Sequence, residues 1–172
     1  MTSFSRDLDA PFDVVWSSVT NVAGATFFGI KNFDKGSGLM TLDYSNMREF
    51  GYYVDCGSLT GGLAIQFQNF PGLPQHSVLN SVPLKKIDLA GTGNITIRAI
   101  GPRKTHIQIN SLYELTGYNT DVVDGKVVLT EAAQWRFTTR DADAQQVGYR
   151  NIICRPSYKL ESDFLTEVSA RL

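Results

Sequence analysis

The sequence predicts a single α+β domain over residues 1–172, in which one helix near each end of the chain packs on the same face of a mainly antiparallel sheet. Two segments with apolar residues at helical spacing lie near the ends, and segments that alternate apolar and polar residues fill the middle. Both helices need an apolar surface to cover them. The apolar face of an antiparallel sheet supplies that surface.

The first part of the chain predicts a short extended segment at residues 3–8 followed by a helix. Asp9-Ala10-Pro11 is typical of a helix start, because a proline in the first turn lacks an amide that would have no partner there. We expect Gly24 to end this helix. Its apolar face consists of Phe12, Val15, Trp16, Val19 and Val22.

The next segments predict a β-hairpin, a further strand and a long irregular excursion. Residues 27–33 and 39–44 flank the turn sequence Asp-Lys-Gly-Ser-Gly at 34–38. Residues 52–56 form the further strand. Residues 57–83 are rich in Gly, Pro, Asn and Gln, and we expect little regular structure there; loops of that length are often functional.

The second half predicts another hairpin, a late strand and a closing helix. The hairpin joins residues 94–100 to 105–115, with apolar residues alternating along both arms. The late strand covers residues 132–138, and its expected partner is 126–130, joined across Asp124-Gly125. The final helix covers residues 156–172 with Ser157 as its N-cap, and its apolar stripe is Leu160, Phe164, Leu165, Val168 and Leu172.

Charge and hydrophobicity exclude several classes of function. The net charge is −1, from 16 basic and 17 acidic residues, so no field of one sign attracts nucleic acid or an anionic membrane. No apolar run approaches the ~20 residues of a membrane span. The first residues lack the apolar core of a signal peptide. We therefore expect either a cytosolic protein or an export signal outside this chain.

The two cysteines, Cys56 and Cys154, leave two states open. They are either buried free thiols or a pair that closes a loop of nearly 100 residues. In the loop-entropy model such a pair stabilises the fold by roughly 4–5 kcal/mol. It persists only in an oxidising compartment.

No pattern in the sequence predicts catalysis. The two histidines, His76 and His106, are 30 residues apart, and no metal-ligand spacing surrounds them. The glycine-containing segments 34–38 and 91–94 precede strands rather than helices, so we interpret both as hairpin turns and not as phosphate sites. We expect no catalytic residue, no cofactor and no metal, and hence a protein that is not an enzyme.

Aromatic residues are the most suggestive feature, with 10 Phe, 7 Tyr and 2 Trp. One hypothesis is that some of them line a cavity between the sheet and a helix; the alternative is that they fill the core. The candidates for cavity lining are Trp16, Trp135, Phe137 and Phe164.

Several short segments carry a resemblance to known families. The stretch from Asp9 to Trp16 resembles the opening of the START/polyketide-cyclase superfamily, whose members enclose apolar ligands. A Trp-bearing first helix, a strand, the sequence Asp34-Lys35-Gly36 and a short strand that ends at Tyr44 are similar to the helix-grip domains of the BamC/NlpB family of Gram-negative envelope lipoproteins. BamC proteins carry two such domains, whereas one is expected here.

Further segments resemble small lipoproteins of Gram-negative bacteria more widely. They are residues 53–57, residues 105–113 and residues 154–161, the last of which places a cysteine just before the final helix. This resemblance implies a periplasmic module of an outer-membrane lipoprotein, with its signal and lipid anchor outside this chain. It also implies a disulfide between Cys56 and Cys154.

The resemblance implies two functions. The first is a non-enzymatic module that contacts an envelope protein through the open sheet face or through residues 57–83. The alternative is a START-like carrier of an apolar small molecule, which requires an enclosed void of some hundreds of Å³ between the sheet and the final helix. A solid core, with Trp16 and Phe164 filling that space, would exclude the carrier.

Overall fold

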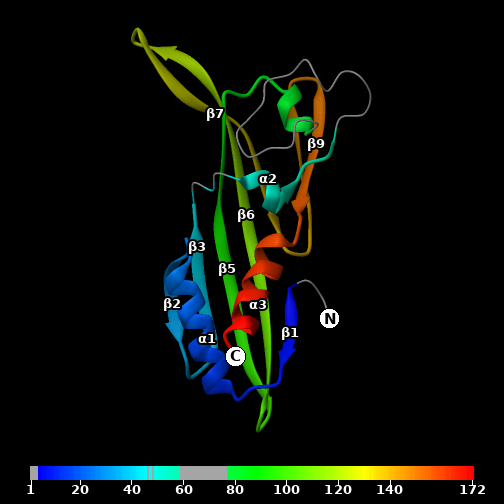
Figure 1. Cartoon of the computed structure of the whole chain (residues 1–172). Coiled ribbons are helices and arrows are strands. Elements are labelled where there is room, and N and C mark those ends of the chain that lie inside the picture. The colour runs from blue at the N-terminus through cyan, green and yellow to red at the C-terminus, as the bar shows by residue number, and fades with distance from the viewer. Residues whose placement is uncertain (1–3, 46, 48, 59–76) are drawn as a thin grey trace. The chain divides into compact units, whose positions relative to one another are not determined.

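The computed structural model describes residues 4–45, 47, 49–58 and 77–172. This part of the chain is α+β with a mainly antiparallel sheet and a few helices, as the sequence predicts (Figure 1). Contacts divide the chain into two compact units. The first contains residues 1–44, 91–112 and 158–172, and the second contains residues 45–90 and 113–157. Each unit is assembled from segments that are distant in the sequence. The single domain over residues 1–172 stays a prediction.

The first unit is built from strands and two helices. One six-stranded sheet has the order β1-β6-β5-β3-β2, and β7 also pairs with β6. Residues of β5 and β6 belong to both units. The elements of the first unit are β1 (Ser5–Leu8), α1 (Phe12–Ala25), β2 (Gly29–Asp34), β3 (Leu39–Tyr44), α3 (Lys159–Ala170) and parts of β5 (Lys86–Gly101) and β6 (Lys104–Val123).

Helices α1 and α3 share one apolar core with β3, β5 and β6. The hydroxyl of Ser18 on α1 donates a hydrogen bond to the carbonyl oxygen of Val168 on α3, at 2.8 Å. Figure 1 shows both helices in front of these strands. The buried members are Leu8 of β1, Ala10 between β1 and α1, Val15, Trp16, Val19, Val22 and Ala23 of α1, Met40 and Leu42 of β3, Ile95 and Ile97 of β5, Ile107 and Ile109 of β6, and Phe164, Leu165 and Val168 of α3.

Both helices differ from the prediction at both ends: Pro11 is the N-cap of α1 rather than a residue of its first turn, and α3 ends at Ala170 rather than Leu172. Helix α1 ends at Ala25 rather than Gly24, and the Thr26 hydroxyl donates to the carbonyl oxygen of Val22. Helix α3 begins at Lys159, and its N-cap position is Tyr158. Ser157 is not the cap, because its hydroxyl donates instead to the carbonyl oxygen of Tyr52.

The turn between β2 and β3 is confirmed, and its geometry explains its sequence. The Asp34 carboxylate accepts hydrogen bonds from the Gly36 amide at 2.9 Å and from the Ser37 hydroxyl at 2.7 Å. Gly38 has φ +69, which disfavours other residues. A Cβ there would also overlap the carbonyl oxygen of Ile97.

The expected turn at residues 91–94 is wrong, because these residues lie inside β5. Gly91 pairs with Tyr44, whose hydroxyl donates to the carbonyl oxygen of Leu112 at 2.8 Å. A Cβ at Gly91 would overlap that carbonyl oxygen and lie 2.6 Å from the Tyr44 hydroxyl. The glycine therefore allows a close approach within the sheet and does not turn the chain.

Gly91→Ala is expected to lower the free energy of unfolding by about 1–3 kcal/mol, because a backbone carbonyl cannot move aside as a side chain can. Gly93→Ala is the matched control, since its Cβ would meet only the Ile109 side chain at 3.9 Å. Urea unfolding of both variants measures the difference. Equal destabilisation by the two substitutions would contradict this account of Gly91.

The second unit contains a separate three-stranded sheet with the order β4-β9-β8. It also contains the part of β6 that pairs with β7. Besides the remainders of β5 and β6, its elements are α2 (Phe50–Tyr53), β4 (Val54–Asp55), the 3₁₀ helix η2 (Val78–Ser81), β7 (Lys126–Thr138), β8 (Asp143–Val147) and β9 (Arg150–Pro156).

Aromatic side chains form the centre of the second unit. The rings of Tyr113 and Phe137 are stacked, with centroids 5.2 Å apart. Trp135 is fully buried, and its indole N–H donates to the carbonyl oxygen of Ile152 at 3.0 Å. This bond joins β7 to β9 and satisfies the polar atom of a side chain that is otherwise apolar.

Several predictions for the second unit need correction. Residues 52–56 form the end of α2 and the two-residue strand β4 rather than one strand. Residues 126–130 are not the partner of 132–138, because both belong to β7. Strands β8 and β9 were not predicted. Of the expected excursion at 57–83, residues 59–76 lie outside the described residues.

Candidate protein-contact site

Cys56 and Cys154 form a disulfide within the second unit. Cys154 lies in β9, and Cys56 directly follows β4, which pairs with β9 through Asp55 and Arg155. The two Cα atoms are 4.0 Å apart, and both side chains are buried. The structure therefore decides between the two states left open by the sequence, and the cysteines are paired.

The β6–β7 hairpin extends past its neighbours. Its turn is Asp124-Gly125, with φ values of 50° and 75°. Two successive positive φ values are typical of a two-residue type I′ turn. At the other end, the amide of Lys85, the residue directly before β5, donates to the carbonyl oxygen of Tyr118. We call residues 119–131 the β6–β7 ribbon.

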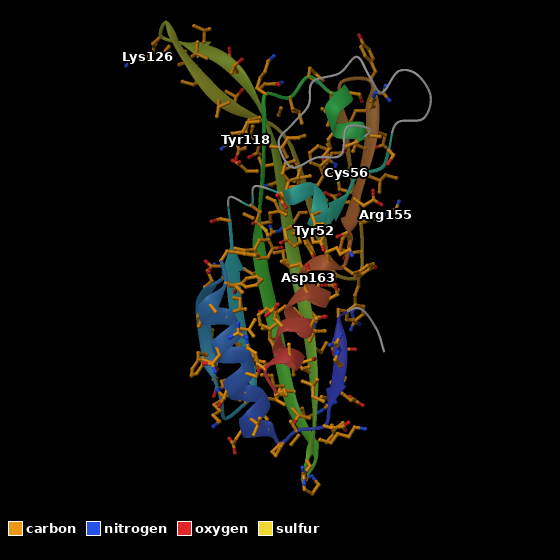
Figure 2. All side chains as sticks on the ribbon, in the orientation of Figure 1. Tyr52, Cys56, Tyr118, Lys126, Arg155 and Asp163 are labelled. Atoms are coloured by element: carbon orange, nitrogen blue, oxygen red, sulfur yellow. A yellow bond between two sulfur atoms is a disulfide. The ribbon has the colours of Figure 1, made fainter. Side chains whose placement is uncertain are left out.

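Apolar side chains on this ribbon are exposed. Figure 1 shows the ribbon extending away from the other described elements of the second unit. Figure 2 labels Tyr118 near its base and Lys126 at its tip. The same strand β7 buries Ala133, Trp135 and Phe137 farther along. On the ribbon, the exposed fractions are 65% for Val122, 51% for Val123, 72% for Val127 and 51% for Leu129.

The charged side chains of the ribbon are mostly acidic. Asp121, Asp124 and Glu131 are negative and Lys126 is positive, which gives the ribbon a net charge of −2. No described residue forms an ion pair with any of these four side chains. The ribbon therefore combines exposed apolar surface with negative charge that no described residue pairs with.

The four aromatics expected to line a cavity are divided between the units. Trp16 and Phe164 belong to the core of the first unit. Trp135 and Phe137 belong to the second unit and are buried there. Trp16 also packs against Phe33, with ring centroids 5.1 Å apart.

A small pocket in the first unit includes one of these aromatics, Phe164. Its volume is about 10 Å³. A space of this size holds about one water molecule. Its lining is almost entirely apolar and consists of Phe28, Leu42, Gly93, Ile95, Ile109, Ser111, Leu160 and Phe164. The hypothesis that all four aromatics line one cavity stays a prediction.

Of the two histidines, His76 lies outside the described residues, and His106 pairs with Asp7. The His106 Nδ1 is 2.6 Å from an oxygen of the Asp7 carboxylate, between paired positions of β1 and β6. This hydrogen bond is the largest influence that holds the pKa of Asp7 below its ordinary value of 3.8; the charges of His106 and Lys104 lower it further.

His106→Leu is expected to raise the pKa of Asp7 toward 3.8. Because the folded-state pKa is depressed, the pair stabilises the fold fully above pH 3.8, and this contribution is lost as pH falls through the folded-state pKa. Carboxyl NMR titration of Asp7 measures the shift. Lys104→Ala, which removes only a weaker charge effect, should move the pKa less; the reverse order would contradict this account.

The part of the chain that the structure describes holds no candidate metal centre. Within it, no three His, Cys, Asp or Glu side chains gather closely enough to hold a metal ion. None of its helices has the length and apolar character needed to cross a membrane. No protein-family model, curated protein or solved structure matches this chain.

The β6–β7 ribbon was not predicted, although the sequence carries a signal for it. Val122-Val123 and Val127-Val128-Leu129 flank the turn as unbroken apolar runs. A strand with one buried face alternates apolar and polar residues, as residues 105–115 do. Adjacent apolar residues in a hairpin next to solvent place apolar side chains on both of its faces.

Proposed function

We propose that this chain is a non-enzymatic module of an envelope lipoprotein, and that it acts in the periplasm by contact with another protein. The observation that carries the contact role is the β6–β7 ribbon, which exposes four large apolar side chains where β6 and β7 extend past the start of β5. A two-stranded hairpin is marginally stable alone in water. Exposed apolar surface of this kind marks interaction sites.

The disulfide supports the periplasmic location. Cys56 and Cys154 are joined in the second unit. Disulfides persist in oxidising compartments such as the periplasm and are rare in the cytosol, where thiols are kept reduced. The lipid anchor of the proposal rests on the resemblance to envelope lipoproteins and would lie outside this chain.

The packing of the first unit supports the helix-grip part of the proposal. Helices α1 and α3 come from opposite ends of the sequence and share a core with β3, β5 and β6. The hydrogen bond from the Ser18 hydroxyl to the Val168 carbonyl oxygen joins the two helices directly. A helix-grip domain requires this kind of joint cover of one sheet face by two terminal helices.

The alternative proposal is a START-like carrier of an apolar molecule. The apolar pocket among Leu42, Ile109 and Phe164 lies between strands and α3, where a carrier would hold its ligand. Its volume of about 10 Å³ is far below the hundreds of Å³ that small-molecule sites provide. The contact module therefore has the stronger support.

In-cell photo-crosslinking tests the contact role. The full chain carries a photo-reactive benzoylphenylalanine at Val127 of the ribbon in the cells that encode it, and a matched variant carries it at Tyr149. Tyr149 is 105% exposed and lies in the turn between β8 and β9. We expect a discrete protein adduct from position 127 and none from position 149. No adduct at position 127 would contradict the proposed function.

A further inference from the structure

Resting on the proposed function, we propose that the β6–β7 ribbon inserts into an apolar groove of another protein, and that Lys or Arg side chains line the rim of this groove. The inference concerns the chemistry and shape of the partner. It follows from where the apolar side chains lie on the ribbon, from its charge, and from its free strand edges.

The apolar side chains require a concave partner. Val122 and Val123 are consecutive in β6, so they project to opposite faces of the ribbon. Both are more than half exposed, and so are Val127 and Leu129 on β7. A flat surface would cover only one face. A groove that receives the ribbon covers both faces and removes all four side chains from water.

The charges favour a basic rim over a second copy of this chain. The ribbon has a net charge of −2, and its acidic groups Asp121, Asp124 and Glu131 have no ion-pair partner among the described residues. Two ribbons brought together would oppose like charges, which costs several kcal/mol when they are juxtaposed. The same negative charge opposes docking on an anionic lipid surface.

The edges of the ribbon allow backbone pairing inside such a groove. Because Lys85, the residue before β5, bonds to Tyr118, residues 119–123 of β6 run past the start of β5. Their outward N–H and C=O groups face no strand of the described chain. A groove wall with an extended segment can pair with this edge and fix the register of the ribbon.

The test uses the full chain in the cells that encode it, with benzoylphenylalanine at Val127 as the probe. Val122→Thr and Val123→Thr each remove apolar character from one face while they keep the β-branched shape. We expect each substitution alone to lower the adduct yield about three- to tenfold, because both faces are buried. A loss with only one of them would mean a flat partner surface and would overturn the groove.

Charge variants test the rim. Asp121→Lys with Glu131→Lys changes the ribbon charge from −2 to +2, and Asp121→Asn with Glu131→Gln changes it to 0. Asp124 is kept so that the turn is unaltered. We expect the reversed variant to lose adduct at least about tenfold and the neutral variant to lose less. An unchanged yield in the reversed variant would overturn the basic rim.

Mass mapping of the adduct completes the test. Support requires that the crosslinked residue lie in an apolar segment flanked by Lys or Arg in a different protein. An adduct of twice the chain mass, or flotation of purified residues 1–172, made without any lipid anchor, with phosphatidylethanolamine–phosphatidylglycerol vesicles, would overturn the inference, whereas an adduct with a different protein would still support the contact role. No adduct at all would remove both. All ribbon variants should unfold at the same urea concentration as the parent chain.

Discussion

Reduction of the Cys56–Cys154 disulfide is expected to lower the free energy of unfolding by about 4–5 kcal/mol. The bond spans 98 residues of sequence, so it removes a large amount of conformational entropy from the unfolded chain. This loss is a large part of the total free energy of unfolding of a domain, which is commonly about 5–15 kcal/mol. The measurement is urea unfolding of the oxidised and reduced chain.

The matched control is the double variant Cys56→Ala with Cys154→Ala, which has no thiols to re-oxidise. It should unfold at nearly the same urea concentration as the reduced chain, and a reducing agent should not affect it. Both cysteines are buried, so the double variant also loses some packing. If the oxidised and reduced chains unfolded together, the crosslink would not restrict the unfolded state as proposed.

Trp135→Ala is expected to lower the free energy of unfolding by about 3–5 kcal/mol. The side chain is fully buried, and its indole N–H bonds to the carbonyl oxygen of Ile152. Alanine removes the packing between β7 and β9 and also leaves that carbonyl without this donor. Denaturant unfolding of the variant, with the disulfide intact, gives the size of the loss.

Trp135→Phe separates the two contributions. Phenylalanine keeps most of the apolar surface but cannot donate to Ile152, so we expect a smaller loss than for alanine, with about 1–3 kcal/mol from the unsatisfied carbonyl. Trp16→Phe makes the same substitution at a buried tryptophan of the first unit, and its loss of unfolding free energy is the comparison. A Trp135→Ala protein as stable as the parent would contradict the central place of Trp135 in the core of the second unit.

The sequence predicted the elements whose signals are local. Pro11 and the spacing of Val15, Trp16 and Val19 located α1, and the turn at residues 34–38 was found because Asp34, Ser37 and Gly38 bond within the turn itself. The alternation of Ile107 and Ile109 located β6. Each of these patterns depends on residues a few positions apart.

Long-range contacts explain what was missed. Gly91 was interpreted as a turn residue, but it is needed because Leu112 and Tyr44, which are distant in sequence, lie against it. Strand β9 gains its order from pairing with β8 and from the disulfide at Cys154. A single sequence without its partners gives little sign of either constraint.

The candidate site was predicted only in part. The pairing of Cys56 with Cys154 was implied only by the resemblance to envelope lipoproteins, whereas composition alone left it open. The ribbon was missed because residues 126–130 were assigned to a strand paired with 132–138, while Val122 and Val123 were assigned to no element. The alternation needed for a covered face stops at Ala133, and no β7 residue on the turn side of it is buried. That change of pattern is visible in the sequence once the turn at Asp124-Gly125 is located.

The most direct test of the exported contact module is the oxidation state of its cysteines in the cells that encode it. Rapid alkylation of the full-length protein before any lysis step, followed by intact-mass measurement without reductant, reports it. We predict that Cys56 and Cys154 carry no alkyl group and that reduction before alkylation adds two. Two alkylated cysteines in the untreated cellular protein would contradict the oxidising compartment and, with it, the envelope role.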